Sequence, residues 1–270
     1  MASLGDVLKA RRRRGQRSLL VYLMAGSVPD ERYLEVVETL AASGVHGLEM
    51  GFPFSDPMAE GPVIQNAATL ALSRGMRWGP FLGLLRECSR KLPTAVMTYM
   101  NPIEQRGVAR AMEEIASAGG TGLILPDLPV EAALPYRKAG RAAGVDTILL
   151  ASPASPPQRL RRLVRSTSGF LYLVSRYGTT GISGGTLPSA RYQTAPLGPL
   201  LREAHEFRPR LPVLVGFGVQ SPEDVQRHLT EGGDGVVVGS AVQKRISEGA
   251  SPEEIGAFVQ SLLPPGSPPV

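Results

Sequence analysis

The chain is poor in the residues that build metal centres and disulfides. Among its 270 residues it has one cysteine, Cys88, which excludes an internal disulfide framework and a cysteine-based zinc site. Its three histidines, His46, His205 and His228, stand far apart without the spacing of metal ligands. We therefore expect no metal and no other cofactor.

Aromatic residues are also few, at 6% of the chain, and this bears on how its positive charge is interpreted. The net charge of +5 is largely local: Arg11–Arg14 with Arg17 form one basic cluster, and four arginines between positions 159 and 165 form another. Such clusters could bind nucleic acid, but no nucleic-acid motif accompanies them. We favour solvated helix faces, and a positive charge also suits an anionic small substrate.

The segment RRRRGQRSLLVYLMAG (11–26) has the order of a secretory signal, with basic residues before a short apolar run. The run is too short to span a bilayer, and cleavage after it would remove the first apolar strand of the chain. We interpret the segment as the end of a helix followed by a buried strand. A cytoplasmic enzyme that does not associate with membranes fits best.

Short apolar runs recur along the sequence, each followed by a loop and an amphipathic stretch of helical period. The eight runs cover residues 19–25, 47–50, 94–99, 122–126, 146–151, 170–175, 212–217 and 235–240. Apolar strands that alternate with helices are typical of a parallel sheet covered on the outside. Eight such units favour an α/β fold with a single (β/α)8 TIM barrel, preceded by an N-terminal helix.

The residues that begin and end the helical stretches agree with this prediction. The stretch at 31–44 ends at Gly44, a C-cap residue, and the stretch at 221–233 opens with Ser221 as N-cap before Pro222. We expect one domain over residues 1–263. The proline-rich end, 264–270, is predicted to be a flexible tail.

The last two runs end in glycines, at the edge where barrels place their chemistry. Gly216–Gly218 follow the seventh run, and Gly239 with Ser240 follow the eighth. Glycine lets backbone N–H groups approach an anion, and a helix N-terminus adds its dipole. The pattern predicts a phosphate site in which Ser240 is both N-cap and donor, although such glycines could also only make tight turns.

The sixth run leads into a long connector, SRYGTTGISGGTLPSAR (175–191), with four glycines. A glycine-rich connector of this length in a compact domain is often a mobile lid, although an idle surface loop is the alternative. The connector follows the sixth run, which is the neighbour of the seventh run and its predicted phosphate site. Gly181 of the connector could therefore supply a further backbone donor.

Two acids lie at predicted strand ends. Glu49 falls inside the second run, where burial would raise its pKa and suit it to proton transfer. The alternative is an ion-paired structural acid, but no basic residue lies nearby in the sequence. Asp127, after the fourth run, could be catalytic or could bind a loop amide. None of the four lysines sits at a predicted strand end, which disfavours Schiff-base aldolase chemistry.

From the residues alone, the chain is predicted to be a barrel that acts on a phosphate ester by carboxylate acid/base catalysis. Tyr22, in the first run, and Tyr99, after the third, could line an aromatic substrate pocket or pack in the core.

From Ser18 to Ile246 the chain closely resembles the tryptophan synthase alpha chain family. The motifs that carry the resemblance are LEMGFPFSDPMAEGPVIQNA, MTYMNPI, LPDLPVE, GFLYLVSRYGTTG, GFGVQSPEDV and GVVVGSA. The resemblance implies a barrel that cleaves indole-3-glycerol phosphate to indole and glyceraldehyde 3-phosphate. It also implies a beta chain that receives the indole in an alpha2-beta2 assembly.

By this resemblance Glu49 is the catalytic glutamate, which protonates indole C3 and removes the proton from the neighbouring glyceryl hydroxyl. Glu60 replaces the second acid of the family, an aspartate that binds the indole N–H within the pattern L-A-D-G-P. The added methylene moves the carboxylate by about 1–1.5 Å, and a displacement of that size can lower the rate about 100-fold. Three interpretations follow: the loop is re-set, activity is impaired, or the substrate has changed.

The resemblance assigns the remaining site residues in four groups. Phosphate binding falls to Gly181, Gly218, Gly239 and Ser240, and the indole pocket to Tyr22, Tyr99, Leu125 and Phe217. The lid carries Arg176 and Thr180, and the surface facing the beta chain carries Pro53, Asp56 and Pro57. The lid has Thr179 where a small aliphatic residue is commoner in the family.

The altered Glu60 and Thr179 leave two other functions open. One is a stand-alone indole-releasing or diverged enzyme, and the other is a non-catalytic partner that only activates a beta chain. A different phosphate-binding barrel, such as an isomerase of the same pathway, is disfavoured by the SDP and SRYGTTG motifs.

Overall fold

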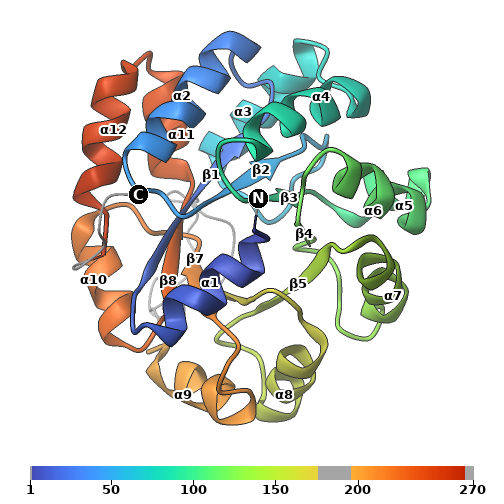
Figure 1. Ribbon diagram of the computed structural model, residues 1–270, viewed down its shortest axis with the longest axis vertical. Helices are drawn as coiled ribbons and strands as arrows, with labels where there is room; N and C mark the ends of the chain where they lie inside the picture. Colours follow the sequence, from blue (N-terminus) through green and yellow to red (C-terminus); the bar gives the residue numbers. More distant parts are fainter. Residues whose placement is uncertain (1, 176–195, 265–270) are drawn as a thin grey trace, which may run out of the picture.

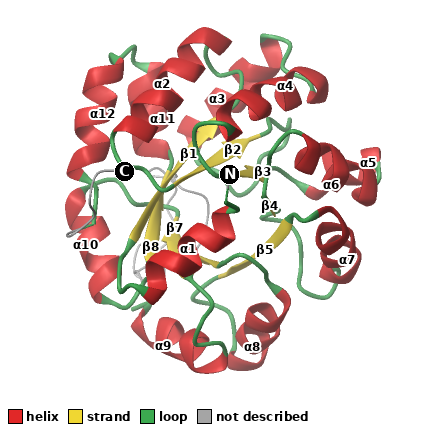
Figure 2. Cartoon of the chain, viewed as in Figure 1, coloured by secondary structure: helices red, strands yellow, loops and turns green. Residues whose placement is uncertain are grey.

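The computed structural model describes residues 2–175 and 196–264, and within them eight parallel strands close into a barrel in sequence order, surrounded by helices (Figures 1 and 2). The strands are β1 (Ser18–Met24), β2 (Gly47–Gly51), β3 (Thr94–Met97), β4 (Gly122–Ile124), β5 (Asp146–Ala151), β6 (Leu171–Val174), β7 (Val213–Gly216) and β8 (Gly235–Val238). Each lies within one of the eight predicted runs, or differs from it by one residue. The predicted TIM barrel is confirmed.

The helices follow the strands as the amphipathic stretches predict. They are α1 (Leu4–Arg13), α2 (Asp30–Ala42), α3 (Pro62–Ser73), α4 (Trp78–Ser89), α5 (Met100–Arg106), α6 (Val108–Ser117), α7 (Ala133–Ala143), α8 (Pro157–Ser166), α9 (Gly198–Phe207), α10 (Pro222–Thr230), α11 (Ser240–Ser247) and α12 (Pro252–Ser261). Ser221 caps α10 by accepting a hydrogen bond from the backbone N of Asp224, as predicted. The C-cap of α2 is Ser43, and Gly44 follows it with φ +85°, so the predicted cap is one residue too late.

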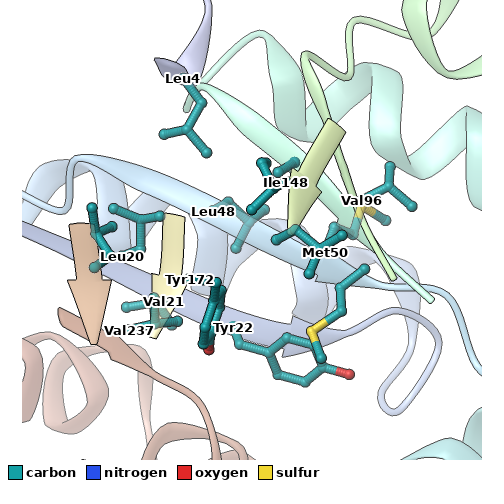
Figure 3. Close-up of a cluster of buried hydrophobic side chains, with 14 of the residues drawn as sticks. Leu4, Leu20, Val21, Tyr22, Leu48, Met50, Val96, Ile148, Tyr172 and Val237 are labelled. Atoms are coloured by element: carbon teal, nitrogen blue, oxygen red, sulfur yellow. The ribbon is translucent and has the colours of Figure 1, made fainter. Parts of the chain in front are cut away.

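The barrel interior is a continuous apolar column with polar groups at one end. In Figure 3, Leu4 lies at one end of this column, and the phenol rings of Tyr22 and Tyr172 lie at the other. The strands are buried almost throughout because helices cover their outer face, which explains runs without a polar alternation.

Helix α1 closes the amino-terminal end of the barrel and lies across it in Figure 1. The Leu4 backbone N donates to Thr121 Oγ1 at 3.1 Å, which ties the start of α1 to the turn before β4. Near the end of α1, Arg12 and the following Arg17 bind the buried carboxylate of Asp234 at 2.8 and 3.2 Å. This part of the first basic cluster therefore has intramolecular partners.

The second basic cluster is similarly engaged with its own chain. Arg159 and Arg162 both approach Glu131, at 3.3 and 3.1 Å, and the Arg161 guanidinium lies 4.4 Å from the centre of the Phe207 ring.

None of the helices that the structure describes combines the length and the apolar character needed to cross a membrane.

The seam between β1 and β8 depends on a glycine, which gives a test of the closure. Gly235 lies opposite Ser18, and a Cβ at this position would collide with the Ser18 backbone carbonyl. Because a backbone atom cannot move aside, we expect Gly235→Ala to lower the free energy of unfolding by about 2 kcal/mol in urea titrations. Gly83→Ala in α4, where nothing lies within 4 Å, is the control and is expected to be neutral or slightly stabilising. Equal effects of the two substitutions would contradict this account of the seam.

Candidate active site

The inner face of β2 carries one acid between two glycines. Side chains alternate along a strand, so Gly47, Glu49 and Gly51 all face the barrel interior. The space beside Gly47 is filled by Leu4, and the space beside Gly51 is filled by the hydroxyl of Tyr22. The sequence GLEMG therefore places a single carboxyl between the apolar column and the aromatic end of the barrel.

Glu49 is buried without compensation. Its exposed fraction is 0%, and neither carboxyl oxygen has a hydrogen-bond partner among the described residues. Removal from water disfavours the charged form and raises the pKa of Glu49 to about 8. The expected burial and raised pKa are confirmed. The alternative of an ion-paired acid is wrong within residues 2–175 and 196–264, where no cation lies within ion-pair distance of Glu49.

A cleft opens at the carboxyl ends of the strands, and we call it the barrel cleft. Its lining consists of Tyr22, Glu60, Ile64, Met97, Tyr172, Phe217, Gly218, Val237, Gly239 and Ser240. Glu49 is not part of this lining, but it lies beside Tyr22, its partner in the register of β1 and β2, and Tyr22 lines the cleft. The cleft has an apolar, aromatic wall with a polar mouth.

The structure brings six of the predicted site residues to the cleft and adds four that the sequence reasoning missed. The missed residues are Ile64, Met97, Tyr172 and Val237. Tyr172 is an aromatic residue inside the sixth run, two positions before the last residue of β6. A search for residues at strand ends therefore does not include it. Tyr99 and Leu125 are buried and do not line the cleft, so their predicted contact with a ligand finds no support in this geometry.

The mouth of the cleft is suited to an anion. Gly239 is the N-cap of α11 and Ser240 is its first residue, so the predicted N-cap is wrong by one position. Gly218 lies in the loop after β7 with φ +97°. Backbone N–H groups and a helix N-terminus therefore meet at the cleft, and both favour negative charge.

The loop after β7 also contains a strained residue. Phe217 has φ +63°, the one left-handed non-glycine residue in the described ranges, a conformation that is costly for an L-residue. Its carbonyl accepts a hydrogen bond from the Ser175 hydroxyl, and its ring packs edge-on against Tyr172 at 5.5 Å. These contacts orient the ring toward the cleft.

Glu60 differs from Glu49 in having hydrogen-bond partners. It is 6% exposed, and the phenol of Tyr99 donates to its Oε2. Burial raises the pKa of Glu60, whereas the bonds from Tyr99 and from nearby backbone N–H groups act in the opposite direction. Asp127 accepts the backbone N–H of Met100 at 3.0 Å, so the structure supports its role in binding a loop amide.

The loop between β2 and α3 has a buried and an exposed part. Pro53 is buried within the chain itself and has little surface to offer a partner, contrary to its assignment to a partner-facing surface. Asp56 is exposed, Pro57 is half-buried, and Met58 is 71% exposed. Asp56 and Met58 are therefore the part of this loop that faces solvent.

Several predicted features lie outside the described residues. These are Arg176, Thr180 and Gly181 of the predicted lid, Thr179 beside them, and positions 265–270 of the predicted tail. Among the residues that are described, no group of three or more histidine, cysteine or acidic side chains could bind a metal ion.

Comparison with known proteins is consistent with this geometry. A sequence model of the tryptophan synthase alpha chain family matches residues 8–262. The tryptophan synthase alpha chain of Gloeobacter violaceus is 40% identical over 240 residues, which cover 88% of this chain and 84% of the relative. Tryptophan synthase of Mycobacterium tuberculosis superimposes with a TM-score of 0.84 at 32% identity, over 97% of both chains. The alpha2-beta2 complex of Pyrococcus furiosus gives a TM-score of 0.79 at 36% identity, over 91% of this chain and 97% of that one.

The uncompensated burial of Glu49 predicts a stability that depends on pH. Below the ordinary pKa of 4.5 the folded and unfolded states both carry the proton, so burial of the carboxyl has no charge penalty. Above that value the unfolded chain loses the proton first, and stability falls until the pH passes the folded pKa of about 8. We expect Glu49→Gln to stabilise the fold by roughly 3 kcal/mol at pH 7, with no gain at pH 4.

Urea denaturation of the two proteins between pH 4 and pH 9 measures this difference. Glu113→Gln on the exposed face of α6 is the control, and it should leave the free energy of unfolding unchanged over the same range. A gain for Glu49→Gln that is the same at every pH would contradict the explanation.

Proposed function

The chain belongs to the tryptophan synthase alpha chain family, and from that premise we propose how its barrel cleft carries out the reaction. The protein is a carbon–carbon lyase of tryptophan biosynthesis that cleaves indole-3-glycerol phosphate to indole and glyceraldehyde 3-phosphate. The observation that carries the proposed mechanism is a buried, unpaired carboxyl, Glu49, next to a cleft whose mouth is a helix N-terminus.

In the proposed mechanism Glu49 moves two protons. With a pKa of about 8 the carboxyl is mostly neutral at pH 7, so it can donate its proton to indole C3. The carboxylate that results takes the proton of the neighbouring glyceryl hydroxyl, and the carbon–carbon bond breaks as the carbonyl of glyceraldehyde 3-phosphate forms. Because Glu49 is not part of the cleft lining, its side chain rotates toward the substrate to reach these atoms.

The cleft orients the substrate at both of its ends. Glu60 accepts the indole N–H and stabilises the positive charge that develops on the ring as C3 is protonated. The backbone around Gly218, Gly239 and Ser240 binds the phosphate, where the N-terminus of α11 adds its favourable potential. Tyr22, Tyr172 and Phe217 enclose the indole ring between these two ends.

We further propose a beta chain as partner, in an alpha2-beta2 assembly. The solved relative from Pyrococcus furiosus is described as showing mutual activation of such a complex. In this chain, a second hollow shares the Phe217 wall of the barrel cleft and includes the exposed Met58. We propose that indole leaves the barrel cleft past Phe217, toward the surface formed by Asp56, Pro57 and Met58. A cytoplasmic location completes the proposal, in keeping with a single, buried cysteine.

Release of indole from indole-3-glycerol phosphate tests the proposed function. We expect Glu49→Gln to lower kcat by about 10³-fold, because an amide can neither donate nor accept the transferred protons. The assay is run with the full chain alone and with a tryptophan synthase beta chain, and Glu113→Gln serves as the control with unchanged turnover. Wild-type protein that stimulates a beta chain and yet releases no indole would instead establish the non-catalytic role.

A further inference from the structure

Glu60 and Tyr99 form a buried pair that joins two neighbouring loops. Tyr99 follows β3 and is the N-cap of α5, whereas Glu60 ends the loop that follows β2. The Tyr99 phenol donates to Glu60 Oε2 and accepts the backbone N–H of Ala59 at 2.9 Å. The phenol therefore uses both its donor and its acceptor on two successive residues of the same loop.

Tyr99 is itself firmly placed. Its ring lies 5.2 Å from the ring of Phe54, and the next residue, Met100, donates its backbone N–H to both oxygens of Asp127 at 3.0 Å. Asp127 follows β4, so the loop after β2 binds the phenol of Tyr99 while the loop after β4 binds the backbone of the next residue. With an exposed fraction of 3%, Tyr99 has no surface role to explain these contacts.

The consequence for Glu60 is geometric. A glutamate has one more rotatable bond than an aspartate, and an unrestrained carboxylate would populate several positions in the cleft. A hydrogen bond from a fixed phenol to an ionised carboxylate is short and strong, so it selects one of these positions. The bond engages Oε2, and Oε1 of the same carboxylate then has a defined direction.

We propose that Tyr99 is a positioning residue that sets the reach of Glu60: it anchors Oε2 so that Oε1 meets the indole N–H despite the added methylene. The Tyr99 hydroxyl is taken up by Glu60 and by the backbone N–H of Ala59, so its action on the indole N–H passes through Glu60. This inference rests on the proposed function of the cleft. It selects the re-set pocket among the three interpretations of Glu60.

A double-mutant cycle tests the proposal in the full-length protein. Tyr99→Phe should lower kcat/KM for indole-3-glycerol phosphate about 10-fold, and Glu60→Asp should lower it about 100-fold because the shorter side chain no longer spans the distance. The double variant should be no worse than Glu60→Asp alone, because Tyr99 acts only through the reach of Glu60. Losses that multiply, or a gain of activity in Glu60→Asp, would overturn the proposal.

The pH profile separates positioning from a general structural role. Among the described residues, the ionisable groups around Glu60 are Tyr99, Asp127, Tyr22, Glu49 and Tyr172. Removal of the Tyr99 donor raises the pKa of Glu60, so the acidic limb of kcat/KM should move to higher pH in Tyr99→Phe. The limb should stay in place in Tyr136→Phe, a control that removes a 2.9 Å phenol–carboxylate bond to Glu104 on the outer helices.

A binding measurement keeps this inference separate from the lyase reaction. Two unreactive probes are compared by calorimetry: an indole-alkyl phosphate and the matching naphthalene-alkyl phosphate, which has no ring N–H. Wild-type protein should prefer the indole probe about 10-fold, and Tyr99→Phe should lose this preference without weaker binding of the naphthalene probe. An unchanged preference in Tyr99→Phe would overturn the positioning role. If wild-type protein shows the preference but releases no indole, the proposed lyase function fails and the positioning role stands.

Discussion

The burial of one unpaired carboxyl is the constraint on which the site depends. Glu49 has neither a cation nor a hydrogen-bond donor beside it, so nothing within the described chain stabilises its charge. The fold tolerates it because the rest of the barrel interior is tightly filled, with Leu4 against Gly47 and the Tyr22 hydroxyl against Gly51. A fold that buries a carboxyl away from water is less stable than one that buries an apolar side chain at the same place. The same burial keeps the Glu49 carboxyl mostly protonated at neutral pH, where it has a proton to donate.

Glu49 and Glu60 have the same side chain and differ in their surroundings. Glu60 receives hydrogen bonds that favour its ionised form, whereas Glu49 receives none. Burial raises the pKa of both acids, but only Glu60 has hydrogen bonds that oppose this rise. In the proposed mechanism the two identical side chains therefore take opposite roles, Glu49 as the proton carrier and Glu60 as the negative charge. Tyr99 enforces this difference, because its phenol is within reach of only one of the two.

Much of the fold could be predicted because the signals were local. Continuous apolar runs identified all eight strands, and Ser221 identified the start of α10 through its own cap. The burial of Glu49 also followed from its place inside such a run. The role of Tyr99 could not be predicted, since its bond to Glu60 joins residues 39 positions apart and depends on the neighbouring order of β2 and β3. The burial of Pro53 was likewise hidden, because proline on a loop gives no periodic signal.

The family resemblance implies a shorter acid at position 60, and the contacts around Glu60 give a physical reason why the longer side chain would fit the proposed mechanism. A longer side chain that remained free would add conformational entropy and blur the position of its charge. Here the residues on either side of the cleft remove that freedom: Gln65 binds the Glu60 carbonyl at 3.0 Å, Tyr99 binds its carboxylate, and Asp127 fixes the start of the helix that carries Tyr99. The position of the Glu60 carboxylate thus depends on three consecutive loops. The longer side chain of Glu60 is held in one place here because the phenol that binds it is itself anchored.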